Sequence, residues 1–242
     1  LKHWKFHYLV DVVTPAELPI TINAIRSQQF RWNKGGAENF RKFITQVITA
    51  KGHPIWTKIN AFFHLINSSM FLNILLVSLL SVPLIYIKSA YPELSLAYDI
   101  STLFIISTII FFTCYWFIHK YIYGGGIRSF LQYINRFISF YTLVMGFSIH
   151  NSIAVLEGYV GKKSSFVRTP KFNQSKMKDN KYTIKKISVY SFIEMALALY
   201  FLFGMYASFN FVAKVDFGLF LFHFFLFIGF SSISYHGLKQ SI

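Results

Sequence analysis

The sequence predicts a mostly α-helical integral membrane protein, and three observations carry the prediction. Hydrophobic residues make up 54% of the 242 residues and charged residues only 14%, whereas soluble domains carry about 25% charged residues. Several apolar segments are long enough to cross the ~30 Å hydrocarbon core of a bilayer. The basic residues cluster between these segments, as the positive-inside rule expects of cytosolic loops.

The N-terminal quarter is expected to lie outside the bilayer. Residues 1–13 include WKFHYLVDVV, whose partial apolar–polar alternation is typical of a β-strand, and the prolines of TPAELP mark a loop after it. Residues 20–47 have helical spacing, with Gly35-Gly36 as a candidate break, and a turn is expected at 51–54. Because the chain opens without Met on a strand-like segment, we expect it to be the C-terminal part of a longer protein.

The remaining chain alternates apolar and basic segments. Residues 55–65 predict an amphipathic helix in the membrane interface. A further apolar stretch, 137–156, is wetter than the others because it carries serine, threonine, histidine and asparagine. Four segments are predicted to cross the bilayer: 66–87, 99–118, 189–210 and 216–235.

The positions of the charged residues indicate whether the more polar stretch, 137–156, crosses the bilayer. Residues 1–65 and 157–188 each hold nine Lys or Arg, and the connections 88–98 and 211–215 hold one each. If 137–156 crossed the bilayer, the second basic cluster would face outside, against the positive-inside rule. We therefore expect four crossings, an interfacial or re-entrant element at 137–156, and both basic regions in the cytosol. Basic residues placed by membrane topology in this way predict the lipid bilayer as a partner and no nucleic acid.

A polar, aromatic and basic cluster, QQFRWNKGG, precedes the first apolar segment. At helical spacing Gln28, Arg31, Trp32 and Gly35 share one face. Arginine pairs with phosphate oxygens through two N–H groups, tryptophan can stack on a sugar ring, glutamine both donates and accepts, and glycine allows close approach. The set suits a molecule with a pyrophosphate and a sugar. An interfacial helix, with tryptophan at the headgroups and arginine on anionic lipid, is the alternative.

Two stretches resemble a known family. Gln28-x-x-Arg31-Trp32, between an ELP segment and a basic FRK, resembles the QxxRW motif of family 2 glycosyltransferases, the membrane-embedded group that contains cellulose, hyaluronan and mannan synthases. Within GKKSSFVRTPK at 161–171, three residues are similar to the F-x-V-T-x-K gating loop of cellulose synthases, although Arg168 stands where the family has Val. These three are Phe166, Thr169 and Lys171.

The resemblance implies the C-terminal part of an inverting family 2 glycosyltransferase, which moves a sugar from a nucleotide-sugar donor to a glycan or lipid acceptor. Gln28 and Arg31 would contact the donor diphosphate and Trp32 the acceptor sugar, while Phe166, Thr169 and Lys171 would form a closing loop over the nucleotide. The implied domain division is a GT-A catalytic remnant with the QxxRW helix, a first membrane region, a basic loop and a second membrane region. The corresponding ranges are 1–54, 55–156, 157–188 and 189–242.

The family also uses parts that this sequence lacks. A divalent cation, Mg or Mn, sits on an Asp-x-Asp motif and a further Asp acts as general base in the full-length enzyme, but no Asp-x-Asp occurs here. No catalytic or metal-binding residue is therefore assigned, and we expect this chain alone to be inactive. The alternatives are a non-catalytic membrane anchor and a transporter or channel. The expected location is a bacterial inner membrane, with residues 1–65 and 157–188 cytosolic.

Overall fold

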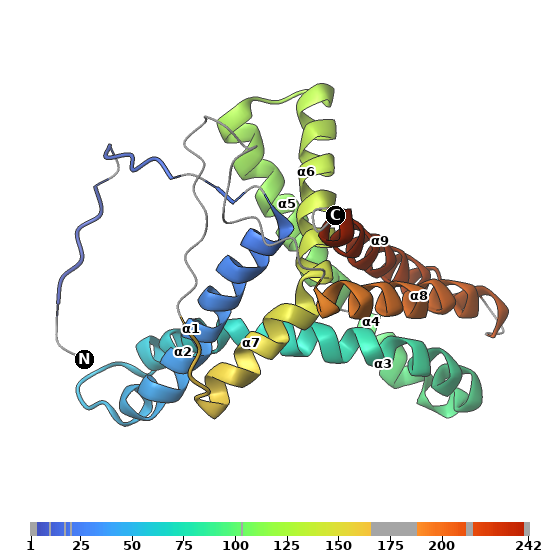
Figure 1. Ribbon diagram of the computed structural model, residues 1–242, viewed down its shortest axis with the longest axis horizontal. Coiled ribbons are helices and arrows are strands. Elements are labelled where there is room, and N and C mark those ends of the chain that lie inside the picture. The colour runs from blue at the N-terminus through green and yellow to red at the C-terminus, as the bar shows by residue number, and fades with distance from the viewer. Residues whose placement is uncertain are drawn as a thin grey trace. The chain divides into compact units, whose positions relative to one another are not determined.

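The described part of the chain is helical, with irregular segments between the helices and no β-strand. The computed structural model describes residues 4–9, 11–16, 18–19, 21–102, 104–165, 188–211 and 215–239. Figure 1 shows the helices in chain order. They are α1 (Ile22–Thr49), α2 (Ile55–Ile66), η1 (Asn67–Ser69), α3 (Met70–Ala90), η2 (Pro92–Leu94), α4 (Ser95–Thr102), α5 (Phe104–Tyr123), α6 (Ile127–Gly146), α7 (Ser148–Val160), α8 (Val189–Asn210) and α9 (Phe217–Lys239).

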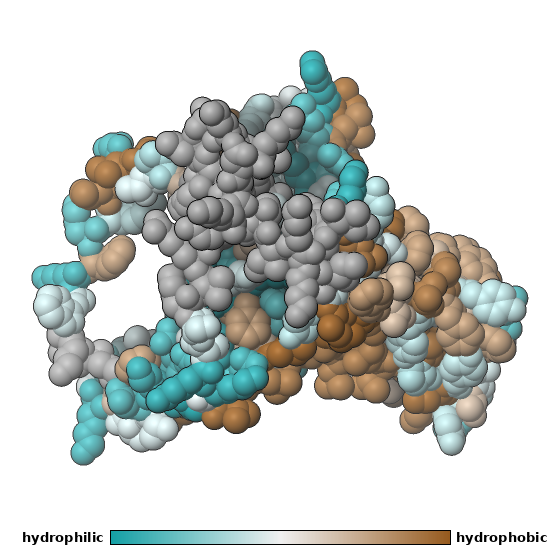
Figure 2. Space-filling model, in the orientation of Figure 1, coloured by the Kyte–Doolittle hydropathy of each residue, from teal (hydrophilic) through white to brown (hydrophobic). Residues whose placement is uncertain are grey.

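The chain divides into two compact units. The first contains α1, α2, η1, the start of α3 and α7, and the second contains the rest of α3 with η2, α4, α5, α6, α8 and nearly all of α9. The motif residues all lie in the first unit, and most of the apolar helical surface lies in the second. Figure 2 shows this surface as largely hydrophobic over α8 and α9.

The first unit is built around α1. Its N-terminus is capped by Thr21, whose hydroxyl accepts a hydrogen bond from the Ala24 N–H at 3.2 Å, as N-cap residues do. Helix α7 lies beside α1 and runs parallel to it. Near the start of both helices the His150 ring Nε2 bonds to the Arg26 carbonyl at 3.2 Å, and farther along both helices Gly158 packs against Ala37. A Cβ on Gly158 would lie 2.6 Å from the Lys34 carbonyl oxygen, so only glycine permits this approach.

An aromatic cluster joins the three longer helices of the first unit. Phe40 on α1 makes edge contacts with Phe62 on α2, at 6.1 Å between ring centroids, and with Tyr159 on α7, at 5.7 Å. Such edge-to-face pairs contribute about 0.5–1.5 kcal/mol beyond the area they bury. The Tyr159 hydroxyl also contacts the Ser69 hydroxyl in η1. Helix α1 is therefore held on one side by α2 and α7.

The second unit packs α3, α8 and α9 around buried polar groups. His223 on α9 is fully buried, lies 2.8 Å from the Ser81 hydroxyl on α3 and stacks on Phe201 of α8. Gly204 on α8 lets the His223 ring approach, since a Cβ there would lie 2.9 Å from it. Helix α6 contacts α9 in the same way, through Gly146. Close packing over small residues is usual where apolar helices associate.

The fold class is confirmed, but the structure corrects two local predictions. The predicted strand at 1–13 is wrong in its described part, because residues 4–9 are irregular and Trp4 and Phe6 are about 90% exposed. A strand needs a neighbouring strand to satisfy its backbone groups, and the described residues offer none. The candidate break at Gly35-Gly36 is also wrong, because α1 continues through both glycines.

Three stretches are long and apolar enough to cross a membrane in the described part of the chain: Ile55–Ala90, Val189–Asn210 and Phe217–Lys239. A fourth arises if α6 and α7, bent by 52° at Phe147, form one span. The predicted interfacial helix at 55–65 is α2, which continues through η1 into α3. The predicted crossing at 99–118 falls on α4 and α5, between which residue 103 lies outside the described residues, and it stays a prediction.

Candidate functional site

Gln28 and Trp32 of the QxxRW motif project from the side of α1 that faces away from α7, and Arg31 lies between that side and the α7 contact. Successive residues of an α-helix are separated by about 100° around its axis. Asn33, Lys34 and Ala37 are buried and lie around the α7 contact. Gln28 and Trp32 point to the opposite side, within about 40° of each other. The three predicted residues therefore lie on the half of the helix that is turned away from Asn33 and Ala37.

This motif face, defined by Gln28, Arg31, Trp32 and Gly35, is open. Trp32 is 62% exposed, and Gln28 and Arg31 are half-buried. No heavy atom of the described residues lies within 4 Å of the position that a Cβ on Gly35 would take. An indole, a guanidinium and an amide thus surround a patch of helix without a side chain, where a ligand can approach the backbone.

The chemistry of this face matches a charged carbohydrate better than a lipid tail. A guanidinium offers N–H groups in a planar fork that fits two phosphate oxygens. An indole offers a flat apolar surface and one N–H donor. The amide of Gln28 can donate and accept, which suits hydroxyl groups. The arrangement can hold an anionic sugar derivative, but by itself it provides no general base or nucleophile.

The C-terminus of α7 ends beside the same helix. Gly161 takes a positive φ of 79°, which glycine adopts without strain. Its N–H donates to the Gly158 carbonyl at 3.2 Å, and the next N–H, of Lys162, donates to the Glu157 carbonyl at 3.0 Å. This pair of bonds is the Schellman motif that closes many helices. The turn brings the Lys162 side chain back to the Glu157 side chain.

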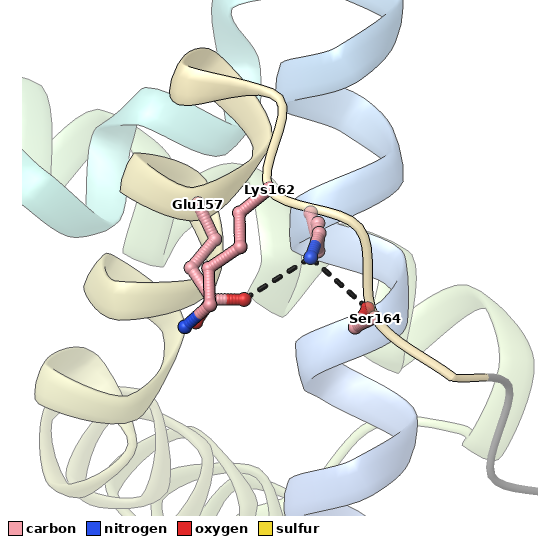
Figure 3. Close-up of polar contacts among 4 residues, drawn as sticks. Glu157, Lys162 and Ser164 are labelled. Carbon is pink, nitrogen blue, oxygen red and sulfur yellow. Dashed lines mark hydrogen bonds and ion pairs between the residues drawn. The ribbon is translucent and has the colours of Figure 1, made fainter.

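Four residues form an ion-pair cluster between α7 and α1, here named the Lys34 cluster. The Lys34 ammonium donates to Glu157 Oε2 at 3.0 Å and to the Ser164 hydroxyl at 3.0 Å. Lys162 contacts the other carboxylate oxygen, Oε1, at 2.5 Å. Figure 3 shows the carboxylate and the serine hydroxyl converging on the lysine from α1. The cluster fastens the residues that follow α7 to the helix that carries the motif.

The charges in this cluster are unequally exposed. The Lys34 side chain is 5% exposed and Glu157 is 17% exposed, while Lys162 is 66% exposed. Hydrogen bonds from Lys162 and from Lys34 lower the pKa of Glu157 against the opposing effect of burial. The carboxylate is therefore ionised at neutral pH and holds the buried lysine. Arg41, two turns farther along α1, adds a longer contact of 3.4 Å to the Tyr159 carbonyl.

Only one of the two predicted groups of site residues lies in the described part of the chain. The structure places Gln28, Arg31 and Trp32 together on one helix face. Phe166, Thr169 and Lys171 lie outside the described residues, so their predicted role stays a prediction. The described stretch 104–165 ends at Ser165, immediately before Phe166. Its last residues include Lys162 and Ser164, which belong to the Lys34 cluster.

Lys34 and Glu157 were not predicted as a pair from the sequence. They are 123 residues apart, and no short-range pattern joins them. One signal was available: glutamate in the last turn of a helix is disfavoured by the helix dipole, so it needs a nearby cation. Lys162 satisfies that need locally, which left no reason to look for a second lysine.

The described residues do not fit the expected divalent cation. None of their histidines, cysteines, aspartates or glutamates form a group of three that could hold a metal ion. Mg and Mn take several oxygen ligands, usually with at least one carboxylate. The cation therefore stays a prediction for the full-length protein, and no step is assigned to it here.

Comparison with known proteins identifies relatives. Glucomannan 4-beta-mannosyltransferase 1 of Oryza sativa subsp. japonica is 45% identical over 64 residues, which is 26% of this chain and 12% of that protein. Probable glucomannan 4-beta-mannosyltransferase 9 of the same plant is 48% identical over 59 residues, or 24% and 11% of the two chains. Glucomannan 4-beta-mannosyltransferase 9 of Arabidopsis thaliana is 27% identical over 229 residues, or 86% and 38%.

These matches confirm the resemblance to family 2 glycosyltransferases of the cellulose-synthase-like type. The matched part spans about an eighth of the rice relative and less than two fifths of the Arabidopsis relative. No protein-family model matches the chain, and no solved structure gives a significant match. These three relatives are plant proteins, and the comparisons do not support the expected bacterial inner membrane.

Proposed function

We propose that the full-length protein is an inverting membrane glycosyltransferase that moves a hexose, mannose first among the candidates, from a nucleotide-activated donor to a growing β-linked glycan. The observation that carries the proposal is the open motif face on α1. Trp32 is 62% exposed and Gly35 has free space around it, so the motif is available to a ligand. The printed names of the relatives, glucomannan 4-beta-mannosyltransferases, supply the sugar class.

In this proposal the motif residues bind and orient. Arg31 holds the donor diphosphate as sugar leaves it, because a guanidinium stabilises charge that develops on phosphate oxygens. Gln28 bonds to the same diphosphate, and Trp32 stacks on the acceptor sugar. Phe166, Thr169 and Lys171 cover the nucleotide and exclude water. The general base and the cation site belong to parts of the full-length protein outside this chain.

We also propose an orientation for this membrane protein. The Lys34 cluster places residues 161–165 beside α1, which supports one common side for the motif face and the basic region that follows α7. The basic residues at 1–65 and 157–188 favour the cytosolic side. Nucleotide sugars are made in the cytosol, so the donor would meet the motif face there.

Activity of motif variants tests the proposal. In the full-length protein in native membranes, Arg31→Ala should lower hexose transfer about 100-fold. Trp32→Ala should lower it up to about tenfold, since an aromatic contact is worth up to about 1.5 kcal/mol. Transfer is measured with radiolabelled nucleoside diphosphate mannose and glucose, normalised to the amount of protein in the membrane.

Two variants serve as matched controls. Trp56→Ala removes an indole that is 72% exposed on α2, and Arg128→Ala removes an exposed guanidinium on α6. Both should retain transfer close to that of the wild type. If the Arg31 and Trp32 variants transfer sugar as well as these controls do, the motif helix acts as a membrane anchor and the proposal is wrong.

A further inference from the structure

The Lys34 cluster lies beside the motif face. Lys34 follows Arg31 by three residues, which separates their side chains by about 60° around the helix axis. Its ammonium is in contact with a carboxylate of α7 and with a hydroxyl of the segment after α7. A residue of the motif helix that lies outside the motif face is thus linked both to α7 and to the segment that precedes Phe166.

Packing of α1 against α7 does not by itself explain the Lys34 cluster, because burying an ion pair costs desolvation free energy. A buried lysine loses hydration that a single ion pair rarely restores, and replacing such a pair by apolar residues is often neutral or stabilising. Glu157 is also placed in the last turn of α7, the end of a helix that repels an acid. Apolar side chains at both positions would join α1 to α7 as well. What they would lack is direction, because an ion pair with defined hydrogen bonds sets one rotation of each helix.

The backbone contacts around the cluster restrict the same rotation. Gly158 meets the Lys34 carbonyl and the Ala37 side chain, so α7 touches α1 directly beside the ion pair. The Schellman motif at Gly161 fixes where Lys162 leaves α7. Turning α1 about its axis would separate Lys34 from Glu157 and would turn Arg31 and Trp32 away from their present direction.

We propose that Lys34 and Glu157 are positioning residues for sugar transfer. They hold α1 in the rotation that presents Gln28, Arg31 and Trp32 to the donor, and they hold residues 161–165 against that helix. This inference rests on the proposed function of the motif face. Neither residue touches the substrate; each acts through α1.

Kinetics of charge variants in the full-length protein test the inference. Lys34→Glu and Glu157→Lys should each raise the donor KM at least tenfold and lower kcat/KM about 100-fold, because a displacement of about 1 Å in a binding face can cost that much. The double variant Lys34→Glu/Glu157→Lys should recover most of the loss. Lys162 can turn into water in the double variant, since it is 66% exposed.

The Lys88–Asp216 ion pair is a matched control in the second unit, with a distance of 2.6 Å and two partly exposed side chains. Lys88→Glu and Asp216→Lys should reduce the yield of folded protein but leave the donor KM unchanged. If the Lys34 and Glu157 variants behave like this control, or if the double variant is no better than the singles, the positioning role is wrong.

A readout without activity separates this inference from the proposed function. Lys34→Met should speed tryptic cleavage after Lys162 and Lys163 in sealed membranes that expose this side, because Ser164 and Glu157 both lose the α1 ammonium that they bond. Faster cleavage together with an inactive wild-type protein would contradict the proposed function but not the attachment. Unchanged cleavage contradicts the attachment, whatever the enzyme does.

Discussion

Glu157 uses each carboxylate oxygen for a different lysine, and this makes its charge a measurable part of the fold. Hydrogen bonds from Lys162 and Lys34 lower its pKa below the usual value of 4.5. A glutamate whose pKa is lower in the folded state stabilises the fold fully above its unfolded pKa. That stability is lost as the pH falls through the folded value.

The lowered pKa of Glu157 predicts how the stability difference between the wild-type protein and Glu157→Gln depends on pH. The Tm of the detergent-solubilised wild-type protein should exceed that of Glu157→Gln by a constant amount between pH 8 and about 5.5. The difference should narrow progressively below pH 4.5, because protonated glutamate and glutamine then resemble each other. A difference that is already absent at pH 7 would mean that the carboxylate contributes nothing to the fold.

At the residue scale, the sequence predicted the motif but not its support. Gln28, Arg31 and Trp32 were found because residues of that chemistry recur at helical spacing within a few positions. Lys34 and Glu157 meet only after the chain has folded over 123 residues. A contact of that range has no periodic signal, and each residue alone looks like an ordinary solvated charge.

At the element scale, the behaviour of α1 depends on its two adjacent glycines. Sequence reasoning placed a candidate break there, because glycine weakens a helix by about 0.5–1 kcal/mol relative to alanine. The helix continues because tertiary contacts outweigh that preference. Gly36 meets the Ser68 side chain so closely that a Cβ there would force a shift, while Gly35 faces open space on the motif face.

Two glycine substitutions should therefore change stability in opposite directions. Gly158→Ala introduces a Cβ that would lie 2.6 Å from the Lys34 carbonyl, and such overpacking costs about 1–3 kcal/mol. In Gly35→Ala the new Cβ would have no neighbouring atom within 4 Å, so this substitution should stabilise α1 by about 0.5–1 kcal/mol. Thermal unfolding in detergent measures both, and a stable Gly158→Ala protein would show that α1 and α7 are not in contact.

The bend between α6 and α7 was only partly visible in the sequence. Residues 137–156 were predicted as one wet, interfacial or re-entrant element, but they belong to two helices at 52° to each other. Gly146 is the last residue of α6 and packs against Gly229 of α9, where a side chain would collide. The polar residues of α7, such as Ser152, which donates to the Phe71 carbonyl at 2.8 Å, then belong to the first unit.

At the scale of the whole molecule, composition predicted the class of protein and charge placement predicted its orientation. Hydrophobicity identified the helices because lipid requires long apolar segments whose backbone groups are satisfied internally. The number of crossings depends on whether 137–156 passes through the bilayer. The positive-inside argument says that it does not, since the basic region after it would otherwise lie outside.

Cysteine labelling measures that orientation directly. With Cys114 replaced by alanine, single cysteines are placed at the exposed positions Tyr91 and Ser165 in the full-length protein. In sealed vesicles of one orientation, a membrane-impermeant maleimide should label only one of the two, because one crossing separates them. Labelling of both from the same side would mean that 137–156 crosses the bilayer and that the proposed orientation is wrong.

The central claim is that the open face of α1 meets a nucleotide sugar, and photocrosslinking tests it most directly. A benzophenone amino acid at position 28 of the full-length protein is irradiated with radiolabelled nucleoside diphosphate mannose, and the same amino acid at position 56 is the control. We predict a label at position 28 that excess nucleoside diphosphate removes, and no such label at position 56. Equal labelling at both positions, or labelling that the nucleotide does not compete away, would contradict the claim.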